Sequence, residues 1–237
     1  MNITLINNNK LIINTVIIVQ ARTNSFRLPN KVLTLVNGIP LLGYLINRLA
    51  KTNDKTKIII ATSDKLIDDP IEKYCIEQNI ICFRDSLLDV ARRMLSAAKH
   101  FDAGAFVRIN GDSPLIDCAL IDYAVDIFQN GDYDLVTNTF PRSFPVGQSV
   151  EVIRTSTFEK AYQKMTKPEE FEHVTKYCYD HPDDFKIHNF KNETDLSNYR
   201  LAVDTAEDLQ CFKKIIDRMD RPYTEYSMND IIALYPS

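Results

Sequence analysis

The chain has 237 residues, 45% hydrophobic and 25% charged, which are values typical of a globular protein with a substantial buried core. Its net charge of −4 argues against a nucleic-acid polymer as partner, since such proteins usually carry a basic surplus, but it is compatible with one basic loop for a single nucleotide. The N-terminal apolar runs are shorter than the ~20 residues of a membrane-spanning helix, no signal peptide is evident, and the cysteines lack metal-ligand spacing, so we expect free thiols in a cytoplasmic protein without membrane contact.

Short β-branched runs alternate with amphipathic helical stretches through the first part of the chain. Strands are predicted at residues 16–20, 57–62, 80–84, 105–109 and 133–137. Helices are predicted at residues 40–51, 70–78, 87–100 and 119–129, and Asp117 is placed to cap the last of them. Residues 1–13 are interpreted as an extension before the first core strand. This rhythm indicates an α/β fold in which helices cover both faces of a mostly parallel sheet.

The rhythm changes after Asn138, where a loop reads TFPRSFPVGQ. The elements predicted beyond it are strands at 150–154, 185–190 and 199–203 and helices at 157–165, 169–179 and 206–218. We interpret residues 1–237 as a single domain that carries an inserted lobe at about 138–190. The last strand and helix return to the main body.

A cation-rich loop, ARTNSFRLPNK, follows the first predicted strand. In open parallel sheets, ligands bind beyond the carboxyl ends of the strands. Arg22, Arg27 and Lys31 could wrap a polyphosphate there, because guanidinium groups make bidentate contacts and an ammonium acts as a point charge. Taken alone, the pattern equally fits a solvated basic loop. The loop contains no glycine, so it is neither a GxGxxG nor a GxxxxGK[ST] phosphate cradle.

Two aspartates, Asp112 and Asp204, lie where predicted strands end. Asp112 alone also fits an Asx turn, whereas the Thr205–Asp208 capping box explains the following helix without Asp204. Carboxylates at the tips of separate strands suit Mg²⁺, which takes one or two protein carboxylates and completes its octahedron with phosphate oxygens and water. The pair is therefore more informative than either member.

The chain resembles the cytidylyltransferases of the spore-coat polysaccharide type, which are relatives of the CMP-Kdo and acylneuraminate synthetases. The matching pieces run in family order from about residue 16 to 218: VIIVQARTNSFRLPNKVL, GIPLL, IIIATSD, FRDSLLDVARRM, VRINGDSPLID, EFEHVTKYC and LAVDTAEDL. The resemblance implies a nucleotide-diphospho-sugar-transferase-like fold, CTP as donor, Mg²⁺ as cofactor and a homodimer formed partly by the lobe. The preference for CTP over UTP rests on this resemblance alone.

The resemblance also implies roles for individual residues. The positions that match the triphosphate loop and the metal-binding pair are Arg22, Ser25, Arg27, Lys31, Asp112 and Asp204. The positions expected near the base pocket are Ala21, Ala61 and Arg108. The positions that fall on the acceptor side are Glu151, Glu172 and His173.

Two departures from the family pattern affect these expectations. Asn24 stands where the family commonly has glycine, and asparagine tolerates left-handed backbone well enough for a turn there to survive. The loop PVGQSVEV stands where relatives read like P-D-G-x-D-V-E, so Val146 and Ser149 replace two acidic residues and Glu151 is left. We therefore expect an unusual acceptor or weakened catalysis.

The implied reaction is attack of an acceptor oxygen on the α-phosphorus of CTP with release of pyrophosphate. The expected acceptor is an acidic sugar or a related small molecule, in the synthesis of surface-glycan precursors. A GT-A-type glycosyltransferase is an alternative, but Asp112-Ser113-Pro114 does not match the D-x-D motif of those enzymes. A nucleotide-binding pseudoenzyme or regulator is a second alternative, suggested by Val146 and Ser149. A purely structural module explains neither the basic loop nor the paired aspartates.

Overall fold

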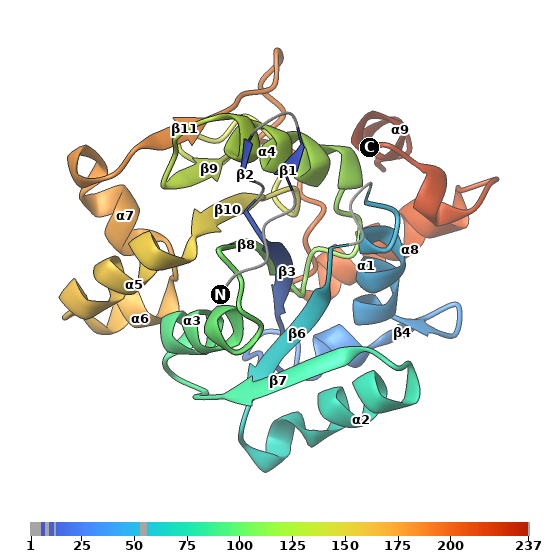
Figure 1. Cartoon of the computed structure of the whole chain (residues 1–237). Coiled ribbons are helices and arrows are strands. Elements are labelled where there is room, and N and C mark those ends of the chain that lie inside the picture. Colours follow the sequence, from blue (N-terminus) through green and yellow to red (C-terminus); the bar gives the residue numbers. More distant parts are fainter. Residues whose placement is uncertain (1–5, 8–9, 12, 53–55, 237) are drawn as a thin grey trace.

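The computed structural model describes residues 6–7, 10–11, 13–52 and 56–236 and is built on a seven-stranded sheet of order β11-β9-β10-β8-β3-β6-β7 (Figure 1). Its strands are β3 (Thr15–Gln20), β6 (Ile58–Ser63), β7 (Ile81–Asp85), β8 (Ala105–Asn110), β9 (Leu135–Thr137), β10 (Glu151–Arg154) and β11 (Ile187–Asn189). β8, β3, β6 and β7 pair in parallel, as do β9 and β11, whereas β10 is antiparallel to both of its neighbours. The predicted mostly parallel sheet is confirmed.

The helices are α1 (Leu41–Leu49), α2 (Asp69–Glu77), α3 (Val90–His100), α4 (Cys118–Asn130), α5 (Thr155–Lys164), α6 (Pro168–Glu172), α7 (Lys176–Asp180), α8 (Ala206–Asp217) and α9 (Met228–Ala233). The helices from α1 to α5 and α8 correspond to predicted helices, whereas α9 was not predicted. Smaller elements are the 3-10 turns Lys31–Leu33, Leu66–Asp68, Pro182–Asp184 and Tyr223–Glu225 and the short pairs β1 (Ile6–Asn7) with β2 (Lys10–Leu11) and β4 (Leu35–Val36) with β5 (Ile39–Pro40). None of the helices in the described ranges is long and apolar enough to cross a membrane.

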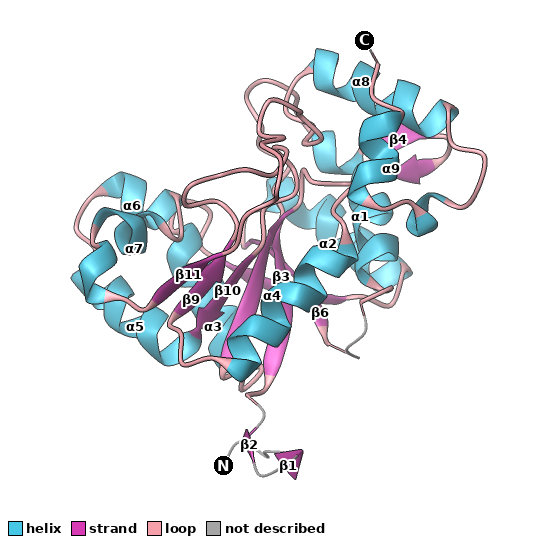
Figure 2. Cartoon of the chain, turned by 90° about the horizontal axis from the view of Figure 1, so that it is seen from above, coloured by secondary structure: helices cyan, strands magenta, loops and turns pink. Residues whose placement is uncertain are grey.

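Helices cover both faces of the sheet, as Figure 2 shows in a view from above. Successive residues of a strand point to opposite faces, so β3 serves two cores. Ile17 and Val19 pack in the cluster that includes buried residues of α1, α2 and α4. Val16 and Ile18 pack in the cluster that includes α3, α5 and α7. This arrangement explains why the first strand is apolar at every central position, and it confirms the predicted coverage of both faces.

A third apolar cluster joins the C-terminal part of the chain to the main body. Tyr44 of α1 and Phe212 of α8 meet edge to face with ring centroids 5.1 Å apart. Leu201 and Val203 are buried in the same cluster, together with Leu115 from the segment after β8. The packing brings the chain around residue 203 next to the carboxyl end of β8.

The predicted strand at 199–203 is wrong, because the segment forms only an isolated bridge between Val146 and Arg200. Its hydrogen bonds go to loops instead of to a neighbouring strand. The Leu201 amide donates to the Val146 carbonyl at 2.7 Å, and the Val203 amide donates to the Asp112 carbonyl at 2.8 Å. The run of buried apolar residues Leu201, Ala202 and Val203 thus reflects burial against loops. The predicted N-terminal extension lies largely outside the described residues.

The single helix predicted at 169–179 is also wrong, since the chain breaks between α6 and α7. His173 leaves the helical conformation with φ −104° and ψ 75°. Val174 is fully buried, and the Thr175 hydroxyl donates to Glu151 at 2.7 Å. These tertiary contacts stabilise a break that no glycine or proline marks in the sequence.

Candidate functional site

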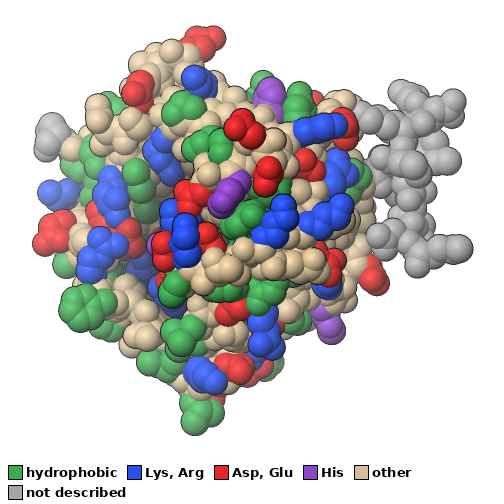
Figure 3. Space-filling view, turned by 90° about the vertical axis from the view of Figure 1, so that its left-hand side faces the viewer, with side chains coloured by type: hydrophobic (Ala, Val, Ile, Leu, Met, Phe, Trp, Pro, Cys, Tyr) green, Lys and Arg blue, Asp and Glu red, His purple; other side chains and the backbone are tan. Residues whose placement is uncertain are grey.

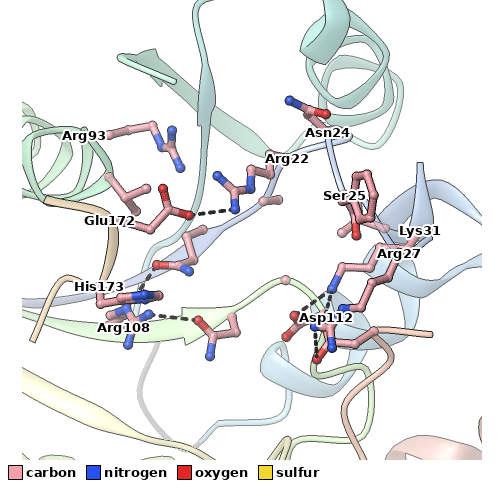
Figure 4. A pocket seen from close by; sticks show the side chains of 18 residues that line it. Arg22, Asn24, Ser25, Arg27, Lys31, Arg93, Arg108, Asp112, Glu172 and His173 are labelled. Carbon is pink, nitrogen blue, oxygen red and sulfur yellow. Dashed lines mark hydrogen bonds and ion pairs between the residues drawn. The ribbon is translucent and has the colours of Figure 1, made fainter. Parts of the chain in front are cut away.

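A cavity of about 710 Å³ lies at the carboxyl ends of β3 and β8. Ten of the residues predicted for the site line it: Ala21, Arg22, Ser25, Arg27, Lys31, Arg108, Asp112, Glu172, His173 and Asp204. Figure 4 shows two groups of side chains across this cavity, with Arg22, Arg93 and Glu172 on one side and Lys31, Arg27 and Asp112 on the other. The structure therefore joins segments that are far apart in the sequence.

The base of the cation-rich loop is fastened by a buried carboxylate, Asp68. The amide and the hydroxyl of Thr23 both donate to Asp68 Oδ1 at 2.7 Å, and Ser63 donates to Oδ2. Burial alone would raise the pKa of Asp68, but the hydrogen bonds from Ser63 and Thr23 outweigh it and lower that pKa below its ordinary value. These hydrogen bonds fix the start of the loop in place. The sequence analysis did not predict this role of Asp68.

The loop ends in a left-handed turn at Asn30, with φ 57°. The turn leads into the 3-10 segment Lys31–Leu33, so the backbone directs Lys31 inward and leaves its side chain only 10% exposed. The expectation that Asn24 would supply a left-handed turn is wrong, because its φ is not positive. The left-handed conformation is adopted by a different asparagine, Asn30, six residues later.

The carboxyl end of β8 lies close against β3 at Gly111. Its amide donates to the Gln20 carbonyl at 2.9 Å, and a Cβ at this position would lie 2.8 Å from the same oxygen. Only glycine fits this approach without a shift. The next residue, Asp112, accepts the amide of Val203, and this bond places Asp204 beside Asp112.

Lys31 connects the two aspartates. Its Nζ lies 2.8 Å from Asp112 Oδ2 and 2.6 Å from Asp204 Oδ1. Arg27 approaches Asp204 Oδ2 at 3.4 Å, and Arg200 donates to the same oxygen. Burial raises the pKa of Asp204, but Lys31, Arg27 and Arg200 more than offset this and lower it below the ordinary value. Asp204 is therefore ionised at neutral pH.

The donor set at this point fits one divalent cation shared with a ligand. Within the described ranges, no group of three or more His, Cys, Asp or Glu side chains could enclose a metal ion. Asp112 and Asp204 nevertheless direct two oxygens at a single positive nitrogen, so the space between them suits positive charge. A pair of carboxylates is what Mg²⁺ takes from a protein when phosphates and water supply its other ligands.

The opposite side of the cavity is formed by Arg22, Glu172 and Arg93. Arg22 Nη2 lies 2.8 Å from Glu172 Oε1, which links the cation-rich loop to α6. Arg93 of α3 was not predicted, yet it lines the cavity while only 1% exposed. Its Nη1 donates to the Ser86 carbonyl, whereas its Nε has no partner among the described residues. Burial and then the nearby charge of Arg22 lower its pKa.

Arg108 lies at the centre of a buried polar network on β8. Its Nη1 lies 2.5 Å from Glu151 Oε2, and its Nε donates to Gln20 at 3.0 Å. The other oxygen of Glu151 accepts from Thr175 at 2.7 Å and Tyr179 at 2.5 Å. Glu151 therefore orients Arg108. Ala61, predicted near the base, is fully buried in β6 and lies outside the lining of the cavity.

A second cavity, of about 420 Å³, adjoins the first. The two share Arg108, Asn110 and His173 in their lining. The remaining lining residues of the second cavity are Thr139, Arg142, Ser149, Glu151, Thr175, Lys176, Tyr179 and Asp180. Glu151, expected on the acceptor side, lines this second cavity, and the region 138–180 forms most of the wall.

The charge of the first cavity differs in sign from that of the chain. Five cationic residues line it, Arg22, Arg27, Lys31, Arg93 and Arg108, against the three carboxylates of Asp112, Glu172 and Asp204. The whole chain, by contrast, carries −4. On the face shown in Figure 3, basic and acidic side chains are interspersed instead of forming a uniform basic stripe. This distribution suits a small polyanion within a cavity.

Comparison with known sequences identifies relatives along nearly the whole chain. A family model described as Cytidylyltransferase matches residues 16–228. The spore coat polysaccharide biosynthesis protein SpsF of Bacillus subtilis is 30% identical over 227 residues, which cover 92% of this chain and 92% of that protein. An uncharacterized protein of Methanocaldococcus jannaschii is 34% identical over 205 residues, 86% of this chain and 83% of that protein.

Solved structures agree with these matches. A cytidylyltransferase from Leptospira borgpetersenii serovar Hardjo-bovis has a TM-score of 0.89 and 32% identity, covering 94% of this chain and 93% of that one. A CMP:2-keto-3-deoxy-manno-octonic acid synthetase complexed with CTP has a TM-score of 0.67 and covers 86% of this chain and 99% of its own. At 14% sequence identity, this structural likeness shows a shared fold and nothing further.

Proposed function

The chain belongs to the cytidylyltransferase family, and from this premise we propose that it transfers CMP from CTP to an acidic sugar or a related small acceptor and releases pyrophosphate. We propose Mg²⁺ as the cofactor and the synthesis of a surface-glycan precursor as the context. The observation that carries the proposal is the convergence of Arg27 and Lys31 with Asp112 and Asp204 at the carboxyl end of the sheet.

The cationic residues are suited to bind and neutralise a triphosphate. Lys31 lies between two carboxylates and lines the cavity. When Mg²⁺ binds those carboxylates, the ammonium of Lys31 would be free to contact phosphate oxygens in the cavity. Arg27 is 61% exposed and reaches over the same point from the loop. These side chains would stabilise the charge that develops on the departing pyrophosphate. When bound by Asp112 and Asp204, Mg²⁺ would supply further charge neutralisation and polarise the phosphoryl oxygens.

The acceptor is proposed from the second cavity and from the relatives. That cavity adjoins the first through Arg108, Asn110 and His173, so a molecule bound there can present an oxygen toward the nucleotide. One structural neighbour is named a CMP:2-keto-3-deoxy-manno-octonic acid synthetase, and SpsF is named for polysaccharide biosynthesis. The first name supports an acidic sugar as acceptor, and the second supports a glycan context for this chain.

The test is pyrophosphate release with CTP, UTP, ATP and GTP. Each nucleotide is combined with a panel of acceptors that includes 2-keto-3-deoxy-manno-octonic acid, sugar phosphates and neutral sugars, with and without Mg²⁺. We expect release only with CTP, Mg²⁺ and one acidic acceptor. CTP binding without release from any pair would favour the nucleotide-binding regulator, and transfer of a sugar from a sugar nucleotide would favour the glycosyltransferase.

The metal assignment is tested by Asp112→Asn. The amide keeps the size of the side chain but removes one of the two charges offered to Mg²⁺, so we expect turnover to fall by roughly 100-fold or more with the circular dichroism spectrum unchanged. Asp183→Asn, at an exposed position, is the matched control. An Asp112→Asn enzyme with normal Mg²⁺-dependent turnover would refute the assignment.

We also propose a homodimer, which the family resemblance supports. Sedimentation velocity at micromolar concentration should give the mass of two chains. A single species of one chain mass would refute this part of the proposal and leave the chemistry unaffected.

A further inference from the structure

The side chains around the second cavity leave one positive charge unpaired. Three cationic residues line it, Arg108, Arg142 and Lys176, against two carboxylates, Glu151 and Asp180. Arg108 pairs with Glu151 at 2.5 Å, and Lys176 pairs with Asp180 at 2.9 Å. Arg142 has no ion pair with any residue that the structure describes. The uncompensated charge of this cavity is therefore located on one guanidinium.

Arg142 is held in place by neutral groups. Its Nη2 donates to the Ser149 hydroxyl at 3.0 Å, and its Nη1 lies 3.4 Å from the Pro145 carbonyl. The residue is partly buried, and burial lowers its pKa while the charge of Glu151 acts in the opposite direction. A partly desolvated guanidinium without a counter-ion gains more from an anion than an exposed one does.

The side chain at position 149 determines whether the positive charge of Arg142 is free to bind an anion. A carboxylate at this position would lie within hydrogen-bond distance of Arg142 and would neutralise it, whereas a hydroxyl orients the guanidinium without removing its charge. Glu151 forms no ion pair with Arg142 among the described residues: its two oxygens accept from Arg108, Thr175 and Tyr179, and its charge acts on Arg142 only from a distance.

We propose that Arg142 binds an anionic group of the acceptor, a carboxylate or a phosphate, and that Ser149 determines this specificity by leaving the guanidinium uncompensated. The inference rests on the proposed function, because it assumes that the second cavity holds the acceptor. The anion would lie on Arg142, and the attacking oxygen would point toward Arg108 and Asn110, where the two cavities meet.

The test measures anion binding to the intact protein with CTP and Mg²⁺ at saturating concentration, so that the triphosphate loop is already occupied. The probes are inorganic phosphate and acetate, titrated by calorimetry. We expect saturable binding to the wild type and a loss of roughly 10- to 100-fold in both Arg142→Gln and Ser149→Asp. The first variant removes the charge, and the second neutralises it while keeping the arginine. The probe with the higher affinity identifies the acceptor's anion as a carboxylate or a phosphate.

Matched controls separate this effect from changes elsewhere. Arg92→Gln removes an exposed arginine of α3, and Ser156→Asp adds a carboxylate at an exposed position of α5, and both should bind the probes like the wild type. If both Arg142→Gln and Ser149→Asp bind CTP and the probes normally, the inference is wrong and the proposed function stands. If the wild type does not bind CTP, the proposed function fails and this inference fails with it.

Discussion

At the scale of single residues, Glu151 is a buried carboxylate whose main contact is the ion pair that orients Arg108. The residue is 3% exposed, pairs with Arg108, and accepts hydrogen bonds from Thr175 and Tyr179. Burial alone would raise the pKa of Glu151, but Arg108, Tyr179 and Thr175 outweigh burial and lower it below its ordinary value of 4.5. Its carboxylate contributes by fixing the position of Arg108 between the two cavities.

Glu151→Gln should destabilise the protein at neutral pH by about 3–5 kcal/mol, because it leaves Arg108 partly buried without a counter-ion. The folded-state pKa of Glu151 is depressed, so its stabilisation is complete above 4.5 and is lost as the pH falls through the lower folded value. The variant should therefore approach the wild type on acidification. Urea unfolding between neutral and acidic pH measures both effects.

Glu72→Gln is the control for this prediction. Glu72 pairs with Arg84 at 2.5 Å, but its side chain is 40% exposed, so solvent screening should limit its loss to about 1 kcal/mol or less. Equal losses in the two variants would show that burial of the Glu151 pair has no special weight.

At the scale of elements, the site depends on how an irregular segment is fastened to the sheet. Gly147 has φ +98°, and a Cβ there would lie 2.5 Å from the Ala202 amide nitrogen. The neighbouring Val146 exchanges backbone hydrogen bonds with Tyr199 and Leu201, which lead the chain to Asp204. The close contact at Gly147 therefore lies at the start of the segment that the Val203–Asp112 hydrogen bond holds beside Asp112.

Gly147→Ala should move this segment and reduce both stability and turnover. Gly38→Ala is the control, because Gly38 has φ +80° but no atom within 4 Å of its added Cβ. We expect the control to lose about 1–2 kcal/mol from the left-handed backbone alone and to retain its turnover. Gly147→Ala should lose about 1–3 kcal/mol more from the steric clash. Thermal unfolding and pyrophosphate release measure the two effects, and equal behaviour of the variants would contradict the role of the contact.

At the scale of the whole molecule, charge is distributed so that an acidic protein contains a cationic cavity. The chain carries −4, while the first cavity has two more cations than carboxylates in its lining. A small polyanion is therefore attracted at the cavity. A long polymer that lies across the face shown in Figure 3 would meet acidic side chains as well as basic ones.

Raising the sodium chloride concentration from about 50 to about 500 mM should weaken CTP binding several-fold, because exposed charges such as Arg27 are screened at short range. Duplex DNA of random sequence should not bind even at the lower concentration. Calorimetry measures the first effect and fluorescence anisotropy the second. DNA binding with an affinity comparable to that of CTP would contradict this account of the charge distribution.

Much of the fold could be predicted because its signals are local. The core strands β3, β6, β7 and β8 and the helices between them appear in the sequence as apolar periods. The cap at Asp117 was also predictable from neighbouring residues, and its side chain accepts from the Ala119 amide at 3.0 Å. The segments predicted wrongly, 169–179 and 199–203, are those in which burial against distant loops replaces the usual pairing or helical continuity.

The sequence by itself determined the α/β architecture, the cation-rich loop after the first strand and the candidacy of Asp112 and Asp204, since each depends on the order of neighbouring residues. Only the tertiary structure decided that Lys31 joins the two aspartates, that Glu151 serves Arg108, and that Arg142 is left without a counter-ion. The physical reason is that electrostatic interactions act through distances of a few ångströms in space. The residues that form these contacts are separated by up to 173 positions along the chain, so their spacing in the sequence does not indicate that their side chains lie close together in space.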